Sequence, residues 1–172
     1  VEIEKDISRL QTITDRFSKI GSEPVLEKRD IIEDTKNTVD YLQTRVSQQV
    51  VFTFKAPEHP IYVDINPALH SWTIENLVKN AIDAMKGKGS LNIIISELED
   101  IVKISITDSG KGIPKNQFTK VFEPGFTTKK RGWGLGLSLT KRIVQEYHKG
   151  KIKVAHSEIG KGTTMQISYK TA

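Results

Sequence analysis

Near the middle of the chain, one segment combines two helical patterns: Asn76-Leu77-Val78-Lys79-Asn80-Ala81-Ile82-Asp83-Ala84-Met85. Apolar residues recur there at spacings of three and four, which predicts a helix with one buried face: Ile74, Leu77, Val78, Ala81, Ile82 and Met85. Polar residues at the same spacings line a second face: Thr73, Asn76, Asn80 and Asp83. Asparagine is a mediocre helix former. Two asparagines one turn apart therefore indicate either a solvated face or a site for a polar ligand.

Three glycine-rich turns follow this segment: Asp108-Ser109-Gly110-Lys111-Gly112, Gly132-Trp133-Gly134-Leu135-Gly136-Leu137 and Gly160-Lys161-Gly162-Thr163-Thr164. Each alone is a weak signal, because Asp-Ser-Gly is typical of a turn that bonds its own backbone and Gly-x-Gly-x-Gly of a flexible loop. In this order, after the asparagine helix, they resemble the ATP-binding module of sensor histidine kinases. That module belongs to the GHKL superfamily, with type II topoisomerases, heat-shock chaperone ATPases and mismatch-repair ATPases. The resemblance covers roughly residues 25 to 172.

The remaining patterns predict an α+β fold, a two-layer α/β sandwich with one helical layer on one sheet. Asp30 and Asn66 are suitable helix caps, and Pro67 suits the first position of the central helix. We expect helices over residues 30–46, 66–87, 116–121 (one or two turns) and 135–147. We expect strands over residues 50–55, 61–64, 91–96, 101–107, 151–155 and 163–169, with 91–96 and 101–107 forming a hairpin.

Residues 1–20 carry an apolar helical stripe that Gly21 ends. Such a stripe indicates packing on the following domain or half of a helical hairpin that dimerises. It resembles the end of the second helix of a histidine kinase dimerisation domain. The predicted division is therefore 1–22, the end of that helix and a linker, and 23–172, the catalytic ATP-binding domain.

The composition excludes several classes. The chain has no cysteine and a hydrophobic fraction of 37%, which indicates a core without disulfides. The net charge is +5, but Lys and Arg are scattered, so we expect no nucleic-acid partner. No apolar run matches a membrane span. We expect a cytoplasmic piece of a longer protein, with a membrane region only in upstream segments.

The resemblance also implies roles for individual residues. Asp108 binds the exocyclic amine of adenine, and Thr163 helps to read the base. Asn80 coordinates the Mg²⁺ that bridges the phosphates, and Asn76 assists through a phosphate or the water shell of the metal. Lys129 reaches the γ-phosphate, or else lies in solvent. The implied ATP-binding set also includes Asp83, Gly110, Gly112, Ile113, Phe122, Thr127, Thr128, Gly132, Gly134, Leu135, Gly136 and Leu137.

The resemblance implies transfer of the γ-phosphoryl group of Mg·ATP to a histidine, and then to an aspartate of a response regulator receiver domain. The other implied partner is the dimerisation and phosphoacceptor domain of the same protein, in a homodimer. None of the four histidines of the chain precedes an acidic residue, as a phosphoacceptor usually does, so we expect the acceptor upstream. We expect these four at the surface or partly packed: His59, His70, His148 and His156.

Two other functions remain open. Hydrolytic GHKL ATPases place a glutamate base one turn before the metal-binding asparagine, where this chain has Asn76. Glu75 is adjacent but lies about 100° around the helix, and an amide cannot take a proton from water. A scaffold that lacks phosphotransfer is the second alternative.

Overall fold

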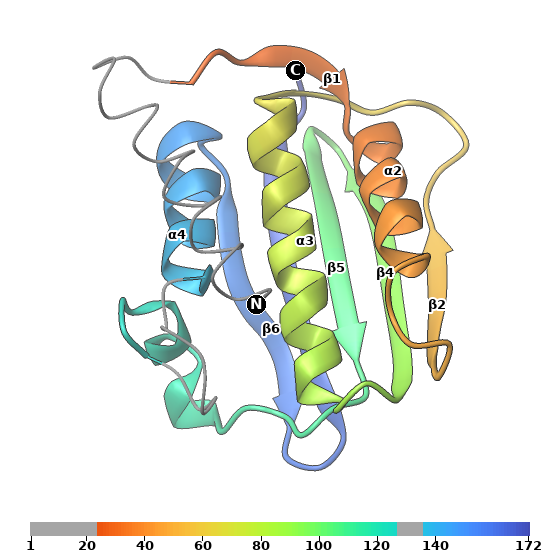
Figure 1. Cartoon of the computed structure of the whole chain (residues 1–172). Helices are drawn as coiled ribbons and strands as arrows, with labels where there is room; N and C mark the ends of the chain where they lie inside the picture. The colour runs from red at the N-terminus through yellow and green to blue at the C-terminus, as the bar shows by residue number, and fades with distance from the viewer. Residues whose placement is uncertain (1–23, 127–135) are drawn as a thin grey trace.

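A computed structural model describes residues 24–126 and 136–172, which form a helical layer packed on a sheet (Figure 1). Within these residues no helix is both long and apolar enough to cross a lipid bilayer. The elements are β1 (Glu27–Asp30), α2 (Ile31–Gln43), β2 (Val50–Lys55), β3 (Tyr62–Ile65), α3 (Pro67–Ala84), β4 (Gly89–Leu98), β5 (Ile101–Asp108), two 3₁₀ turns (Lys115–Gln117 and Lys120–Phe122), α4 (Gly136–Arg142), a π-helical turn (Ile143–Tyr147), β6 (Lys151–Glu158) and β7 (Gly162–Lys170).

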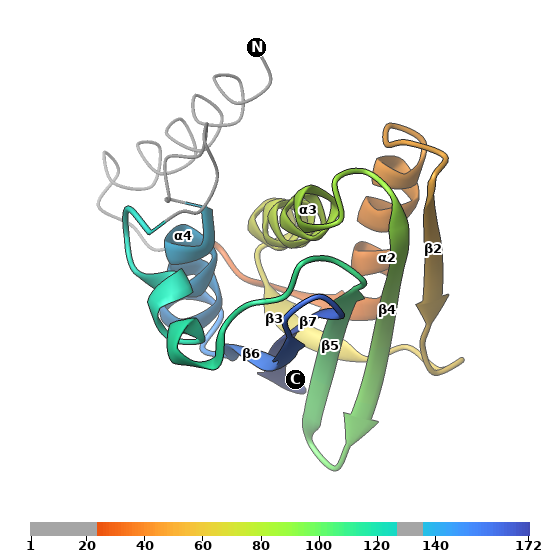
Figure 2. The ribbon, with the colours of Figure 1, turned by 90° about the horizontal axis from the view of Figure 1, so that it is seen from below.

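The main sheet has five strands in the order β2-β4-β5-β7-β6. β2 pairs with β4 in parallel, and all the other pairs are antiparallel. Helices α2, α3 and α4 cover one face of this sheet, and none of the described helices lies on the other face (Figures 1 and 2). This arrangement confirms the predicted two-layer sandwich, including the β4–β5 hairpin.

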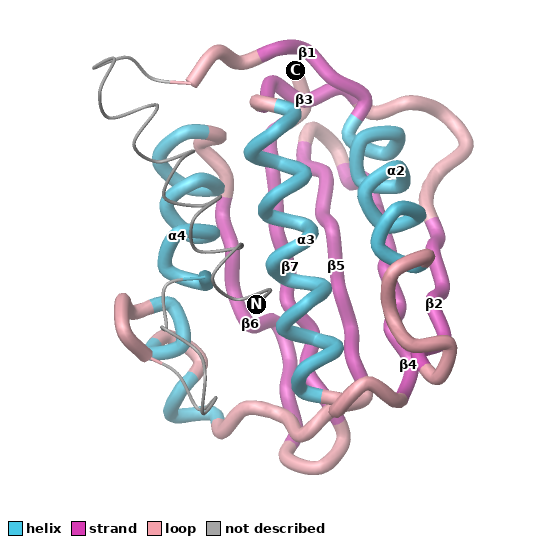
Figure 3. Tube along the Cα trace, viewed as in Figure 1, coloured by secondary structure: helices cyan, strands magenta, loops and turns pink. Residues whose placement is uncertain are grey.

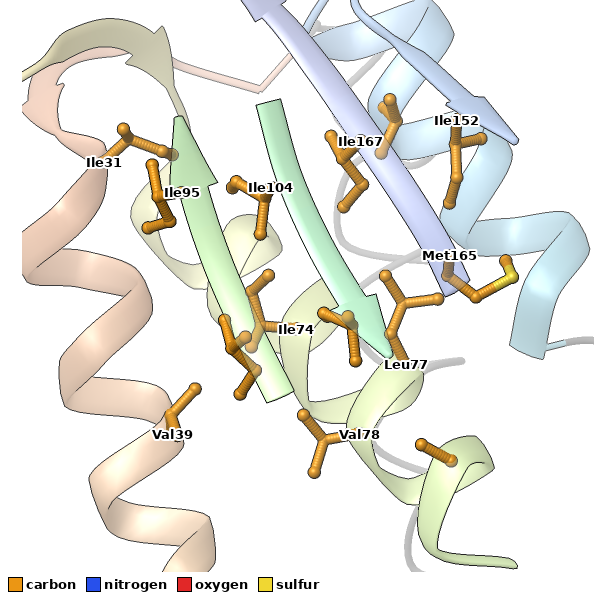
Figure 4. Close-up of a cluster of buried hydrophobic side chains, with 14 of the residues drawn as sticks. Ile31, Val39, Ile74, Leu77, Val78, Ile95, Ile104, Ile152, Met165 and Ile167 are labelled. Atoms are coloured by element: carbon orange, nitrogen blue, oxygen red, sulfur yellow. The ribbon is translucent and has the colours of Figure 1, made fainter. Parts of the chain in front are cut away.

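The core lies between helices α2 and α3 and the covered face of the sheet (Figure 4). Ile74, Leu77 and Val78 of α3 are at most 2% exposed, as the apolar stripe predicts. The strands supply alternate side chains to the same layer, because successive residues of a strand point to opposite faces; Ile95, Ile104 and Ile167 are among them.

Both predicted helix caps are confirmed. The Asp30 carboxylate accepts the backbone N–H of Ile32 at 3.1 Å, and the Asn66 side chain accepts that of Leu69 at 3.1 Å. Pro67 is the first residue of α3, where its missing N–H costs no hydrogen bond. Helix α2 ends at Gln43, three residues before the predicted end at residue 46.

The prediction missed β1 and gave no partner for β3. β1 pairs antiparallel with β3 in a separate two-stranded sheet beyond one end of the helical layer (Figure 3). The sequence of β1 is Glu-Lys-Arg-Asp, which has no apolar alternation, so only the pairing with β3 defines it as a strand. The backbone N–H of Ala172 donates to the carbonyl of Tyr62 at 2.8 Å and so joins the last residue to the two-stranded sheet.

The predicted helix over residues 135–147 is confirmed from Gly136 to Tyr147, but its second half is π-helical. α4 ends at Arg142, and a π-helical turn follows over Ile143–Tyr147. The His148 N–H donates to the carbonyl of Ile143 at 2.9 Å, a five-residue spacing. The wider turn changes the direction of the side chains that follow. His148 is consequently buried between this segment and β7.

Two histidines are buried, contrary to the prediction that all four lie at the surface or are only partly packed. His70 is 0% exposed and contacts the Thr35 hydroxyl at 2.8 Å. His148 Nε2 accepts the backbone N–H of Asn66 at 3.1 Å, so its hydrogen is on Nδ1, 3.3 Å from the Tyr169 hydroxyl. Burial lowers the pKa of His70 to about 3 and that of His148 to about 4. Both are therefore neutral parts of the folded structure.

Candidate functional site

Asp108 and Thr163 lie directly opposite each other where β5 ends and β7 begins. Their residues are 7% and 5% exposed. Directly opposed residues of an antiparallel pair have their side chains on the same face and in contact range. The sheet therefore brings together two polar groups that are 55 residues apart in the sequence, as the resemblance implies.

The Asp108 carboxylate is buried, and no cation in the described part of the chain forms an ion pair with it. Burial raises its pKa, and the backbone N–H groups of Gly110 and Thr163 oppose that shift. The Gly110 N–H donates to Oδ1 at 2.8 Å. Because a buried carboxylate is costly unless it accepts hydrogen bonds, this group is well suited to a neutral N–H donor such as an exocyclic amine.

The glycines around Asp108 are required because the backbone there packs directly against other backbone segments. Gly162 has φ +132°, and a Cβ there would overlap the Asp108 carbonyl. A Cβ on Gly110 would lie 2.6 Å from the Ala84 carbonyl oxygen. The Lys111 N–H also donates to the Ala84 carbonyl at 3.0 Å. The loop after β5 is thus held against the C-terminal end of α3, beside the helix that carries the asparagines.

Ser157 of β6 is a polar residue of this region that the sequence did not predict. Its hydroxyl accepts the Ile113 N–H at 2.7 Å, donates to the Gly162 carbonyl at 3.0 Å, and lies 2.7 Å from the Thr163 hydroxyl. No sequence motif distinguishes Ser157 from any other serine in a strand. Only the pairing of β6 with β7 makes it a neighbour of the site.

Asn76 is held by Thr140, a second residue that the sequence did not predict. The Asn76 Nδ2 donates to the Thr140 hydroxyl at 2.9 Å, and that hydroxyl donates to the Gly136 carbonyl at 2.8 Å. Thr140 is fully buried between α3 and α4. Because Nδ2 donates to Thr140, the Oδ1 atom of the same amide faces Gly136. A Cβ added to Gly136 would lie 2.7 Å from this oxygen.

The other residues of the predicted polar face of α3 have different surroundings. Asn80, one turn after Asn76, is half-buried, and Asp83 is exposed near the end of the helix. Thr73 does not belong to this face, since it is fully buried and its hydroxyl donates to the Leu69 carbonyl at 2.9 Å. The polar face therefore begins at Asn76.

The remaining predicted residues divide into two groups. Phe122 is buried in the core, with the Lys141 ammonium 5.9 Å from its ring centre, and Ile113 and Leu137 are half-buried against the same core. Gly112 has φ +80° and packs against the Glu158 carbonyl. Six predicted site residues lie outside the described part of the chain: Thr127, Thr128, Lys129, Gly132, Gly134 and Leu135.

Known proteins match both the sequence and this geometry. The family model for histidine kinase-, DNA gyrase B- and HSP90-like ATPases matches residues 69–172. The sensor histidine kinase ZraS of Escherichia coli K12 is 40% identical over 121 residues, which is 70% of this chain and 26% of ZraS. Sporulation kinase E of Bacillus subtilis 168 is 32% identical over 174 aligned positions, covering 96% of this chain and 23% of the kinase. The chain thus spans about a quarter of the length of these relatives.

Solved structures agree with this result. The nucleotide-free catalytic domain of histidine kinase ThkA superposes with a TM-score of 0.76 at 26% identity, over 84% of this chain and 95% of that domain. ThkA in complex with the response regulator protein TrrA gives a TM-score of 0.77 at 26% identity, over 98% of this chain and 49% of ThkA.

The chain therefore belongs to the family of histidine kinase-, DNA gyrase B- and HSP90-like ATPases. Its fold is that of a histidine kinase catalytic domain; ZraS and ThkA are named as histidine kinases, and the Bacillus relative is named as a sporulation kinase.

Proposed function

We propose that this chain is the catalytic, ATP-binding part of a sensor histidine kinase, which transfers the γ-phosphoryl group of Mg·ATP to a histidine upstream of residue 1. The observation that carries the proposal is the buried Asp108 carboxylate, which faces Thr163 across β5 and β7. A pair of buried oxygen acceptors beside close-packed backbone is suited to a flat base with an exocyclic amine, as in adenine.

The α3 amides fit the phosphate end of Mg·ATP. Magnesium prefers oxygen ligands and retains several waters, and the half-buried Asn80 amide supplies such an oxygen. Asn76 presents a second amide oxygen, because Thr140 holds its nitrogen. The ion would neutralise charge on the phosphates. Lys129 would reach the γ-phosphate, and Asp83 would lie at the outer end of the phosphate region.

The same helix argues for transfer to a protein side chain over hydrolysis. Asn76 occupies the position of a general base, and an amide cannot accept the proton of a water. The neighbouring Glu75 pairs with Lys79, with 3.1 Å between the carboxylate and the ammonium. Phosphoryl transfer depends mainly on positioning and electrostatics, which amides, backbone N–H groups and a bound metal would supply.

The proposed organisation follows the resemblance of residues 1–20 to the end of a dimerisation helix. Residues 1–22 would be the end of a dimerisation helix and its linker, and residues 23–172 the catalytic domain. The acceptor histidine would lie on an upstream part of the dimerisation domain. The whole protein would be a cytoplasmic homodimer. The ThkA–TrrA complex supports a response regulator receiver domain as the next partner.

Calorimetry with ADP and ATP, with and without Mg²⁺, tests the binding step. We expect binding of both nucleotides, with ATP binding strengthened by Mg²⁺. Folded protein that gives no heat with either nucleotide would refute the proposal. For the transfer step, an added phosphoacceptor domain should become labelled from γ-labelled ATP, and the label should be acid-labile, as phosphohistidine is.

A further inference from the structure

The Ser157 hydroxyl links β6 to the loop after β5 and to the start of β7, beside Asp108 and Thr163. Its oxygen lies 2.7 Å from the Ile113 N–H, 3.0 Å from the Gly162 carbonyl and 2.7 Å from the Thr163 hydroxyl. A serine hydroxyl has one hydrogen and two lone pairs. Three partners therefore use its full capacity, and their chemistry determines the direction of each hydrogen bond.

Two of these directions follow directly from the partners. The Ile113 N–H can only donate, so it occupies one lone pair of Ser157. The Gly162 carbonyl can only accept, so it takes the single Ser157 hydrogen. The remaining contact, at 2.7 Å, must then be a hydrogen bond from the Thr163 hydroxyl to the second lone pair of Ser157.

The hydrogen of Thr163 is consequently directed toward Ser157. Thr163 presents lone pairs on the face that it shares with Asp108, whose carboxylate, when ionised, is also only an acceptor. A purine with an amine at position 6 offers a donor to these groups. At position 6 itself, a 6-oxo purine offers only an oxygen, for which neither side chain has a donor.

We propose that Ser157 is a positioning residue that sets the polarity of the Thr163 hydroxyl and so makes the site select 6-amino over 6-oxo purines. The inference rests on the proposed function, because it assumes that a purine nucleotide binds beside Asp108. Without the Ser157 acceptor, the Thr163 hydroxyl is free to rotate and donate to a 6-oxo group.

The test compares the affinities of ADP and inosine diphosphate, which has an oxygen in place of the 6-amine, by calorimetry. Ser157→Ala also removes the support of Ile113 and should weaken both nucleotides. The informative readout is therefore the ratio of the two affinities, which a loss of support alone would not change. We expect the preference for ADP to fall by roughly three- to tenfold, the value of about one hydrogen bond.

Two further variants address folding and shape. Ser157→Cys keeps the shape, but its sulfur is a weak acceptor, so it should lower the ratio even if Ser157→Ala fails to fold. Ser157→Thr retains a hydroxyl and should retain the preference. Thr164→Val is the matched control, because it removes the hydroxyl that pairs with Thr107 at 2.8 Å on the opposite face of the same strands.

The outcomes separate the two proposals. Wild-type protein that binds ADP, with an unchanged ratio in Ser157→Cys, would overturn the role of Ser157 and leave the proposed function intact. An equal loss of preference in Thr164→Val would also overturn that role. Wild-type protein that binds neither nucleotide would overturn both.

Discussion

Replacing Thr140 with valine tests whether a hydroxyl on α4 orients the Asn76 amide on α3. Valine keeps the shape and removes two hydrogen bonds, the one from Asn76 Nδ2 at 2.9 Å and the one to the Gly136 carbonyl at 2.8 Å. At about 1 kcal/mol each, their loss should lower the free energy of unfolding by roughly 1–2 kcal/mol. The freed amide can rotate and turn its nitrogen toward the phosphate region.

The site effect is separable from this loss of stability. In Thr140→Val the Asn76 amide must be reoriented when Mg·ADP binds, and the free energy required is about that of one hydrogen bond. We therefore expect roughly three- to tenfold weaker affinity for Mg·ADP. Affinity for ADP without Mg²⁺ should change less, because the Asp108 end of the site is not altered. Calorimetry measures both affinities, and urea unfolding measures the stability. Thr140→Ser should restore both.

Thr38→Val is a matched control for Thr140→Val. Thr38 is also a buried helical threonine whose hydroxyl donates to a carbonyl four residues back, that of Asp34 at 3.1 Å. Its hydroxyl likewise contacts α3, at Ser71 Oγ, 2.9 Å away. It should therefore lose similar stability with no change in Mg·ADP affinity. Equal affinities in the two variants would refute the role of Thr140.

Three further predictions follow. Asp108→Asn places an amide where an acceptor is required, and a buried unsatisfied group costs about 1–3 kcal/mol, so ADP affinity should fall roughly ten- to a hundredfold; unchanged affinity in calorimetry would remove Asp108 from the site. The pKa values of His70 and His148, lowered by burial to about 3 and about 4, lie below the ordinary 6.5, so the unfolded chain takes up protons that the folded chain excludes. The contribution of these two histidines to the free energy of unfolding is complete above pH 6.5. Below that pH it falls by up to about 1.4 kcal/mol per pH unit for each histidine. Urea unfolding that gives equal stability at pH 7 and pH 5 would contradict this. The isolated chain should not label itself from γ-labelled ATP, because its expected acceptor lies upstream; acid-labile label on the chain alone would show that the acceptor is within it, and rapid release of phosphate without label would favour a hydrolytic ATPase.

The sequence alone determined the elements whose signals are local. The cap residues Asp30 and Asn66, the apolar stripe of α3 and the hairpin of β4 and β5 each depend on residues a few positions apart. These patterns fix which face of each element is buried. The motif that contains Asp108 was likewise readable because its aspartate and glycines are adjacent in the chain.

Only the tertiary structure decided which polar groups meet. Thr140 reaches Asn76 across 64 residues, and Ser157 reaches Ile113 across 44, so no local pattern could predict either contact. His148 is buried because a π-helical turn and the N–H of Asn66 provide an enclosed position for it. β1 exists only because β3 pairs with it. In each case the stabilising hydrogen bond is made with a partner that is distant in the sequence. Long-range packing brings that partner within hydrogen-bond distance.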